Sequence, residues 1–89
     1  MIIPFDITEQ HIALGVRDHA GKCPAAVALA NVLGPSVTVW VYPYRLEFDG
    51  KPCAIPADLG AWVNAFDRGE RVEPASFVVD TEEPCWRGL

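Results

Sequence analysis

The chain has 89 residues, which suffices for one small hydrophobic core but not for a deep cavity beside it, so a large catalytic pocket is not expected. Seven basic residues against twelve acidic ones give a net charge of −5. This charge disfavours nucleic acid and anionic membranes as partners, because both require concentrated Lys and Arg. With 51% hydrophobic residues the chain is expected to fold, and its acidic surface favours solubility or a basic protein partner.

From the sequence we expect neither a membrane span nor a leader segment. No stretch approaches the roughly 20 apolar residues that cross a bilayer, and the opening residues MIIPFD lack the basic region of a signal peptide. Cys23, Cys53 and Cys85 form no Cys-x-x-Cys pair, and an odd number of widely spaced cysteines favours reduced thiols. We therefore expect a cytoplasmic protein without a cofactor or a metal.

The first predicted elements are a strand and a short helix. Residues 1–6 are apolar and partly β-branched, but Pro4 cannot donate to a strand ladder, so at most a short edge strand is expected. Thr8 is a suitable N-cap for a helix that ends near Leu14, with Gly15 as its stop.

Residues 24–33 predict the helix around which the rest of the fold is organised, after a charged loop over residues 16–22. Pro24 suits the first helical position, where the missing N–H has no partner to lose, and Gly34 suits the residue just past the helix end. The stretch is apolar on nearly every side, so it must be buried by the rest of the chain.

A strand and a hairpin are predicted next. Residues 37–42, VTVWVY, carry the strongest strand signal in the chain, and the strand resumes over residues 44–48 after an interruption at Pro43. Asp49-Gly50 is a favoured type I′ turn, after which residues 51–55 return. Pairing across this turn puts an apolar set on one face, formed by Tyr44, Leu46, Phe48, Cys53 and Ile55.

The alternation through Pro43 leaves two interpretations open. Strict alternation would put Trp40 and Tyr42 on the core face, and the valines at positions 37, 39 and 41 on the opposite face. Since both sets are apolar, either the segment is covered on both sides, or a bulge at Pro43 shifts its face and leaves one set exposed.

A third helix is predicted between Pro56 and Gly69, with Gly60 inside it as a sign of close packing. Its apolar stripe has helical spacing and consists of Leu59, Trp62, Val63 and Phe66.

Residues 76–79 predict a last short strand, and residues 81–89 a loose, flexible tail. The order (β)ααββαβ predicts an α+β fold with one domain over residues 1–80. In this fold three short helices pack on a small, largely antiparallel sheet of three or four strands.

Four groups of residues have a familiar order and spacing. They are Ile7-Thr8 with His11-Ile12 and Gly15, Cys23-Pro24 with Ala26, Ala28 and Leu29, Trp62-Val63 with Phe66-Asp67 and Gly69, and Val72 with Pro74 and Phe77. Together they resemble a group of short, uncharacterised proteins of actinobacteria, phages and other mobile elements. The resemblance carries over no catalytic or binding residue. It implies a mobile-element context, in which small acidic proteins often bind and disable a host machine.

Cys23 is the candidate nucleophile, because it begins the 24–33 helix beside Lys22, where the helix dipole and a cation would lower a thiol pKa. A nucleophile also needs a base, and the sequence assigns neither His11 nor His19 to that role. A thiol-dependent enzyme or redox sensor is therefore an alternative to a small buried thiol. The two histidines and Cys23 match no familiar zinc spacing.

Trp40, Tyr42 and Tyr44 are the leading binding candidates, because aromatic residues dominate interface hot spots; core packing is the competing interpretation. Further acidic candidates, which are either solvated or imitate nucleic-acid phosphates, are Asp80, Glu82 and Glu83.

These features predict a small non-enzymatic protein-binding module that occludes a partner. Together with the resemblance, they imply an accessory or inhibitory protein of the anti-defence, anti-CRISPR type. A nucleic-acid mimic is a further alternative, whereas direct binding to nucleic acid or membrane is not expected. A homodimer through residues 37–42 is also open, because an uncovered apolar edge tends to pair.

Overall fold

The structure, a computed structural model, describes residues 2–82 of the chain. Its α+β class is the predicted one. In chain order the elements are β1 (Ile2–Ile7), α1 (Glu9–Leu14), α2 (Pro24–Leu33), β2 (Val39–Tyr42), β3 (Arg45–Phe48), β4 (Lys51–Cys53), α3 (Ala57–Asp67) and β5 (Ala75–Asp80). The described strands form two antiparallel sheets rather than one, with β1 paired to β5 and with β2, β3 and β4 side by side in that order.

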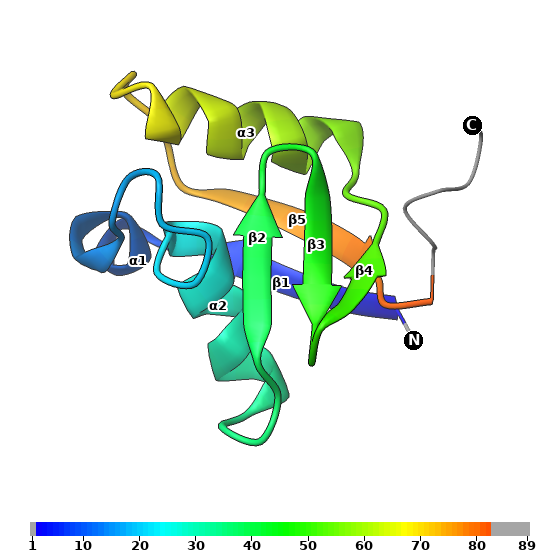
Figure 1. The fold of residues 1–89 in the computed structure, drawn as a ribbon. Helices are drawn as coiled ribbons and strands as arrows, with labels where there is room; N and C mark the ends of the chain where they lie inside the picture. Colours follow the sequence, from blue (N-terminus) through cyan, green and yellow to red (C-terminus); the bar gives the residue numbers. More distant parts are fainter. Residues whose placement is uncertain (1, 83–89) are drawn as a thin grey trace.

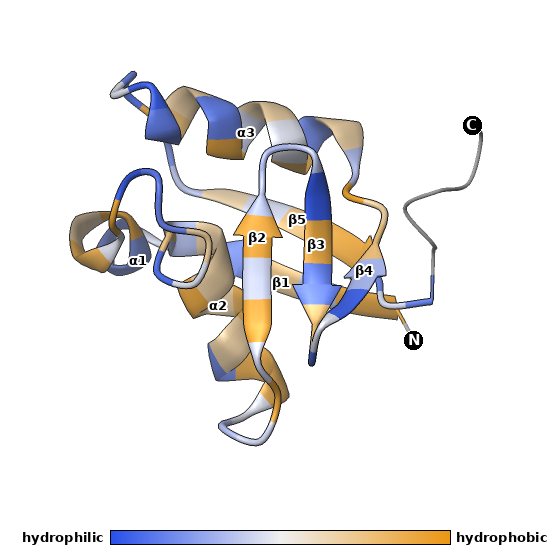
Figure 2. Ribbon diagram, viewed as in Figure 1, coloured by the Kyte–Doolittle hydropathy of each residue, from blue (hydrophilic) through white to orange (hydrophobic). Residues whose placement is uncertain are grey.

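The hydrophobic core lies between the two sheets. In Figure 1, β1 and β5 run across behind β2, β3 and β4, with α2 at the left and α3 along the top. Every second residue of β1 is buried, and residues from the other sheet meet them in the same cluster, including Val39, Val41 and Leu46. Figure 2 shows the same arrangement as hydrophobic segments on both sheets and on α2. Two small sheets therefore bury one shared core, which neither could form alone.

β1 is longer than the expected short edge strand. It extends to Ile7 and pairs along its whole length with β5, with Pro4 opposite Val78. Since β1 has a hydrogen-bonded neighbour on one side only, a proline is tolerated if its nitrogen faces the other side. β5 likewise extends one residue beyond the prediction at each end.

α1 and α2 have the predicted ends. Thr8 caps α1: its Oγ1 accepts the N–H of His11 at 3.3 Å, and the ring Nδ1 of His11 accepts the N–H of Thr8 at 3.0 Å. Pro24 is the first residue of α2, and Gly34 follows it with a φ of 91°. The expected burial on all sides fails in the last turn of α2, where Val32 is 55% exposed, because this end extends past β1 in Figure 1.

Of the two interpretations of the alternation at Pro43, strict alternation is wrong. Pro43 and Tyr44 form the turn of a hairpin, in which Tyr42 pairs with Arg45. A turn restarts the alternation, so β2 buries Val39 and Val41 and turns Trp40 outward, the reverse of strict alternation. The face shifts at the proline as the bulge hypothesis required, but through a turn.

The second hairpin is confirmed in register. Leu46 pairs with Cys53 and Phe48 with Lys51, and both turn residues, Asp49 and Gly50, have positive φ as type I′ requires. The expected place of Tyr44 on the apolar face of this hairpin is wrong, because Tyr44 belongs to the turn before β3 and is 68% exposed.

α3 packs through the predicted stripe, in which Leu59, Val63 and Phe66 are buried. Gly60 marks a close approach, as expected: a Cβ atom there would lie 2.6 Å from the carbonyl oxygen of Pro43. α3 therefore rests directly on the β2–β3 turn.

Within residues 2–82 no helix is long and apolar enough to cross a membrane. Glu83 and the rest of the predicted tail after Glu82 lie outside the described residues.

Candidate functional site

The outer side of the β2–β3–β4 sheet carries the predicted aromatic residues. In the hairpin register, Trp40 lies opposite Glu47, and Tyr42 lies opposite Arg45. Within the described residues no helix lies over this side of the sheet, which faces the viewer in Figure 1. We call Trp40, Tyr42, Tyr44 and Arg45 the aromatic face.

Trp40 is positioned by the loop between α1 and α2. Its ring stacks on that of His19, with centroids 6.5 Å apart and planes inclined by 7°. A Cβ atom on Gly21 would lie 3.0 Å from the Trp40 ring, so the loop backbone passes close to the indole. Trp40 remains 37% exposed, so it is supported along its ring and still open to solvent.

The two tyrosines and Arg45 form one stacked group. The rings of Tyr42 and Tyr44 lie 5.5 Å apart, and the guanidinium carbon of Arg45 lies 4.7 Å and 5.5 Å from their centroids. Arg45 also forms an ion pair with Glu47 at 2.6 Å. Its Nε atom is buried without a hydrogen-bond partner. The group holds a cation and two aromatic rings in place on the open side of the sheet.

A pocket of about 420 Å³ adjoins the aromatic face. Tyr42 and Tyr44 line one part of it. Polar and charged side chains of the α1–α2 loop and of the C-terminal end of α3 line another: Asp18, Asn64, Asp67 and Arg68. Asp67 Oδ1 accepts the backbone N–H of Asp18 at 3.0 Å, which joins two segments that are 49 residues apart in sequence. We call this the Tyr–Asp pocket.

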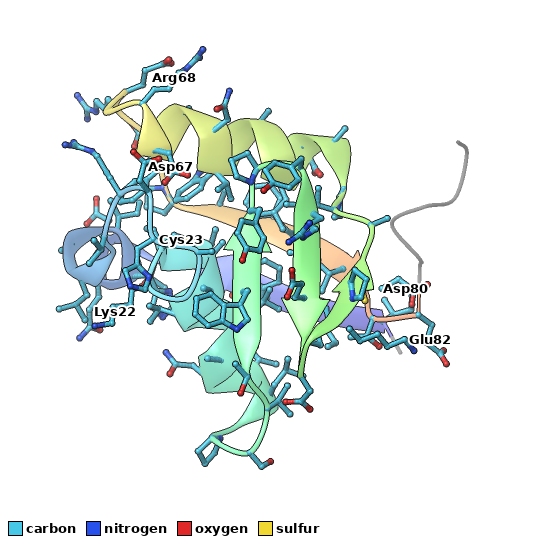
Figure 3. All side chains as sticks on the ribbon, in the orientation of Figure 1. Lys22, Cys23, Asp67, Arg68, Asp80 and Glu82 are labelled. Atoms are coloured by element: carbon cyan, nitrogen blue, oxygen red, sulfur yellow. The ribbon has the colours of Figure 1, made fainter. Side chains whose placement is uncertain are left out.

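The acidic candidates lie elsewhere. Asp80 ends β5 and accepts the N–H of Glu82 at 3.0 Å. Figure 3 places both residues beyond β4, whereas Trp40 is on β2 at the opposite edge of the sheet. The structure thus brings the three aromatic candidates together and separates them from Asp80 and Glu82; Glu83 lies outside the described residues.

Cys23 does not have the environment of an activated thiol. Its side chain is 1% exposed, and its Sγ lies 3.9 Å from the carbonyl oxygen of Val41 as a weak donor. Burial raises the pKa of the Cys23 thiol, and the charge of Asp67 raises it further, against the lowering effect of backbone hydrogen bonds such as that of Ala26. Burial therefore outweighs the helix N-terminus that made Cys23 a candidate nucleophile. The residue is the small buried thiol of the competing interpretation.

Neither histidine ring is placed to act as a base for the Cys23 thiol. The ring of His11 caps α1 and its Nε2 lies 3.3 Å from Asn31 Nδ2, while the ring of His19 stacks on Trp40. In the part of the chain that the structure describes, no three His, Cys, Asp or Glu side chains are grouped to hold a metal ion.

The edge of β2 is partly occupied. The N–H of Val41 donates to the carbonyl oxygen of Ala20 at 2.9 Å, so the loop pairs with this part of the strand on the side away from β3. Self-association through residues 37–42 would have to use the remainder of the edge.

The chain matches no known protein family, no curated protein and no solved structure. The site is therefore interpreted from its own geometry. Sequence reasoning missed Asp18 and Asn64, since no periodicity or motif marks them. Arg45 has aromatic neighbours because Tyr42 faces outward and Tyr44 lies in the adjoining turn.

Proposed function

We propose that this protein is a non-enzymatic protein-binding module and that the aromatic face is its contact surface. The observation that carries the proposal is that Trp40, Tyr42 and Tyr44 all lie on the open side of one sheet, with Arg45 stacked on the tyrosines. Trp, Tyr and Arg are the residue types most enriched among interface hot spots.

The support around these side chains favours tight binding. The ring of His19 and the backbone at Gly21 hold the indole of Trp40, and Glu47 holds the guanidinium of Arg45. Side chains that are already ordered lose less conformational freedom when a partner binds. The stacked group is therefore suited to serve as a rigid anchor.

Binding through this face would act by covering a surface of the partner. The resemblance to proteins of mobile elements directs the search for a partner to bacterial host proteins, and inhibition of a host defence system is the form of this proposal that we favour.

Affinity capture from an actinobacterial lysate tests the proposal. The bait is the full chain, compared with Trp40→Ala and with Val78→Ala, a control on the exposed side of β5 in the other sheet. We expect a partner that wild type and Val78→Ala retain, and an affinity loss of about thirtyfold or more in Trp40→Ala, as for a hot-spot residue. Equal retention by folded Trp40→Ala would exclude the aromatic face, and no specific partner would exclude the function.

A further inference from the structure

We propose that the Tyr–Asp pocket receives one basic side chain, Lys or Arg, of the protein partner. This inference rests on the proposed function and deepens it, because it names the chemistry that the partner must present beside the aromatic face.

The pocket is continuous with the aromatic face. Tyr42 and Tyr44 belong to both, so a partner that covers the face also closes the pocket. Aromatic ring faces attract cations through their quadrupole, and the attraction strengthens when water is excluded. The position of Arg45 over the same two rings shows that their geometry suits a guanidinium.

Two carboxylates, those of Asp18 and Asp67, line the pocket against one cation, Arg68, so the side chains of the lining carry a net negative charge. Asp67 is half-buried, and only its Oδ1 takes a hydrogen bond within the described residues, from the N–H of Asp18. Within residues 2–82, neither the carboxylate of Asp18 nor that of Asp67 forms an ion pair. Two cations lie at the pocket with carboxylate partners of their own: Arg68, which also lines it, pairs with Glu70, and Arg45 pairs with Glu47, each at 2.6 Å. Arg17 lies near Gly69, just beyond the pocket.

The carboxylates of Asp18 and Asp67 are suited to bind a group that donates several hydrogen bonds. A carboxylate accepts hydrogen bonds and does not donate them when ionised, and the guanidinium or ammonium group donates in several directions. The amide of Asn64, which also lines the pocket, adds another acceptor oxygen. The net charge of −5 adds a long-range attraction for a basic surface.

The first test uses small probes in place of the partner. Nα-acetyl-arginine amide and Nα-acetyl-lysine amide are titrated into the labelled protein, and amide chemical shifts are followed; Nα-acetyl-norleucine amide is the neutral control. We expect saturable shifts confined to the residues around Asp18, Tyr42 and Asp67, with no such shifts from norleucine. The absence of saturable shifts with both basic amides would overturn the inference.

The second test uses the captured complex. Asp67→Asn keeps an acceptor for the Asp18 N–H but removes the charge, so it should weaken partner binding at least about tenfold. Asp58→Asn, which removes one charge at the other end of α3, should leave affinity unchanged. If Trp40→Ala abolishes binding while Asp67→Asn does not alter it, the pocket inference fails and the proposed function stands. If only polyamines or inorganic cations compete at the pocket, a basic side chain is excluded.

Discussion

Gly60 of α3 and Pro43 of the β2–β3 turn meet so closely that a Cβ atom on Gly60 would lie 2.6 Å from the Pro43 carbonyl oxygen. At Gly60 the backbone of the helix therefore lies directly against the backbone of the turn. This turn contains Tyr44 and directly follows Tyr42. The contact with α3 therefore holds in place the segment that carries both tyrosines.

Gly60→Ala should destabilise the protein by about 1 to 3 kcal/mol, because the added methyl group must displace the turn. Helix propensity alone predicts the opposite sign, a gain of up to about 1 kcal/mol. The free energy of unfolding from urea denaturation decides between them. A more stable Gly60→Ala variant would show that α3 and the turn do not pack in this way.

The stability of the protein should decrease at alkaline pH because of Cys23. Burial raises its folded-state pKa above the ordinary value of 9.0, so the thiol loses its proton more readily in the unfolded chain. The thiol's contribution is fully present below pH 9 and is lost as pH rises through the folded pKa. We expect the free energy of unfolding to fall more steeply above pH 9 in wild type than in Cys23→Ala. Parallel pH profiles would contradict the raised pKa.

Cys23 should resist alkylation in the folded protein. Iodoacetamide reacts with the thiolate, and a buried thiol with a raised pKa presents little of it. Trypsin cleavage after Lys22 and Arg45 gives a peptide with Cys23 as its only cysteine, so mass spectrometry can follow this site alone. Labelling at the rate of a free peptide thiol would restore the thiol-dependent alternative.

Arg45→Ala should destabilise the protein more than Arg71→Ala does. Both arginines form an ion pair with a glutamate two residues away, but only Arg45 also stacks on two tyrosine rings. The comparison therefore separates the stacking from the ion pair, since exposed pairs contribute little. Urea denaturation of both variants measures the difference. Equal losses would mean that the stacking adds nothing.

Local signals predicted the helices and the second hairpin. Three such signals depend only on neighbouring residues, and the structure contains all three. They are the helix cap at Thr8, the helix ends at Pro24 and Gly34, and the hairpin turn at Asp49-Gly50. Pro43 with Tyr44 carries no glycine or asparagine to indicate a tight turn, so the restart of alternation was not visible. For this reason the sequence left the inward and outward faces of β2 open between two interpretations.

Contacts between segments far apart in the chain could not be predicted from the sequence. The split into two sheets depends on the pairing of β1 with β5 across nearly the whole chain. The hydrogen bond from Asp18 to Asp67 joins a loop to the end of α3, with no motif in either segment. The three aromatic candidates were named from sequence, whereas the pocket beside them required the fold.

Hydroxyl-radical footprinting of the captured complex tests the central claim most directly. Tyr44 is 68% exposed and Trp40 37% exposed in the free protein, so both should be oxidised readily and then protected when the partner binds. Val78, 53% exposed on the other sheet, should be modified equally in both states. Protection at Val78 with none at Tyr44 or Trp40 would show that the partner binds elsewhere and that the aromatic face is not the contact surface.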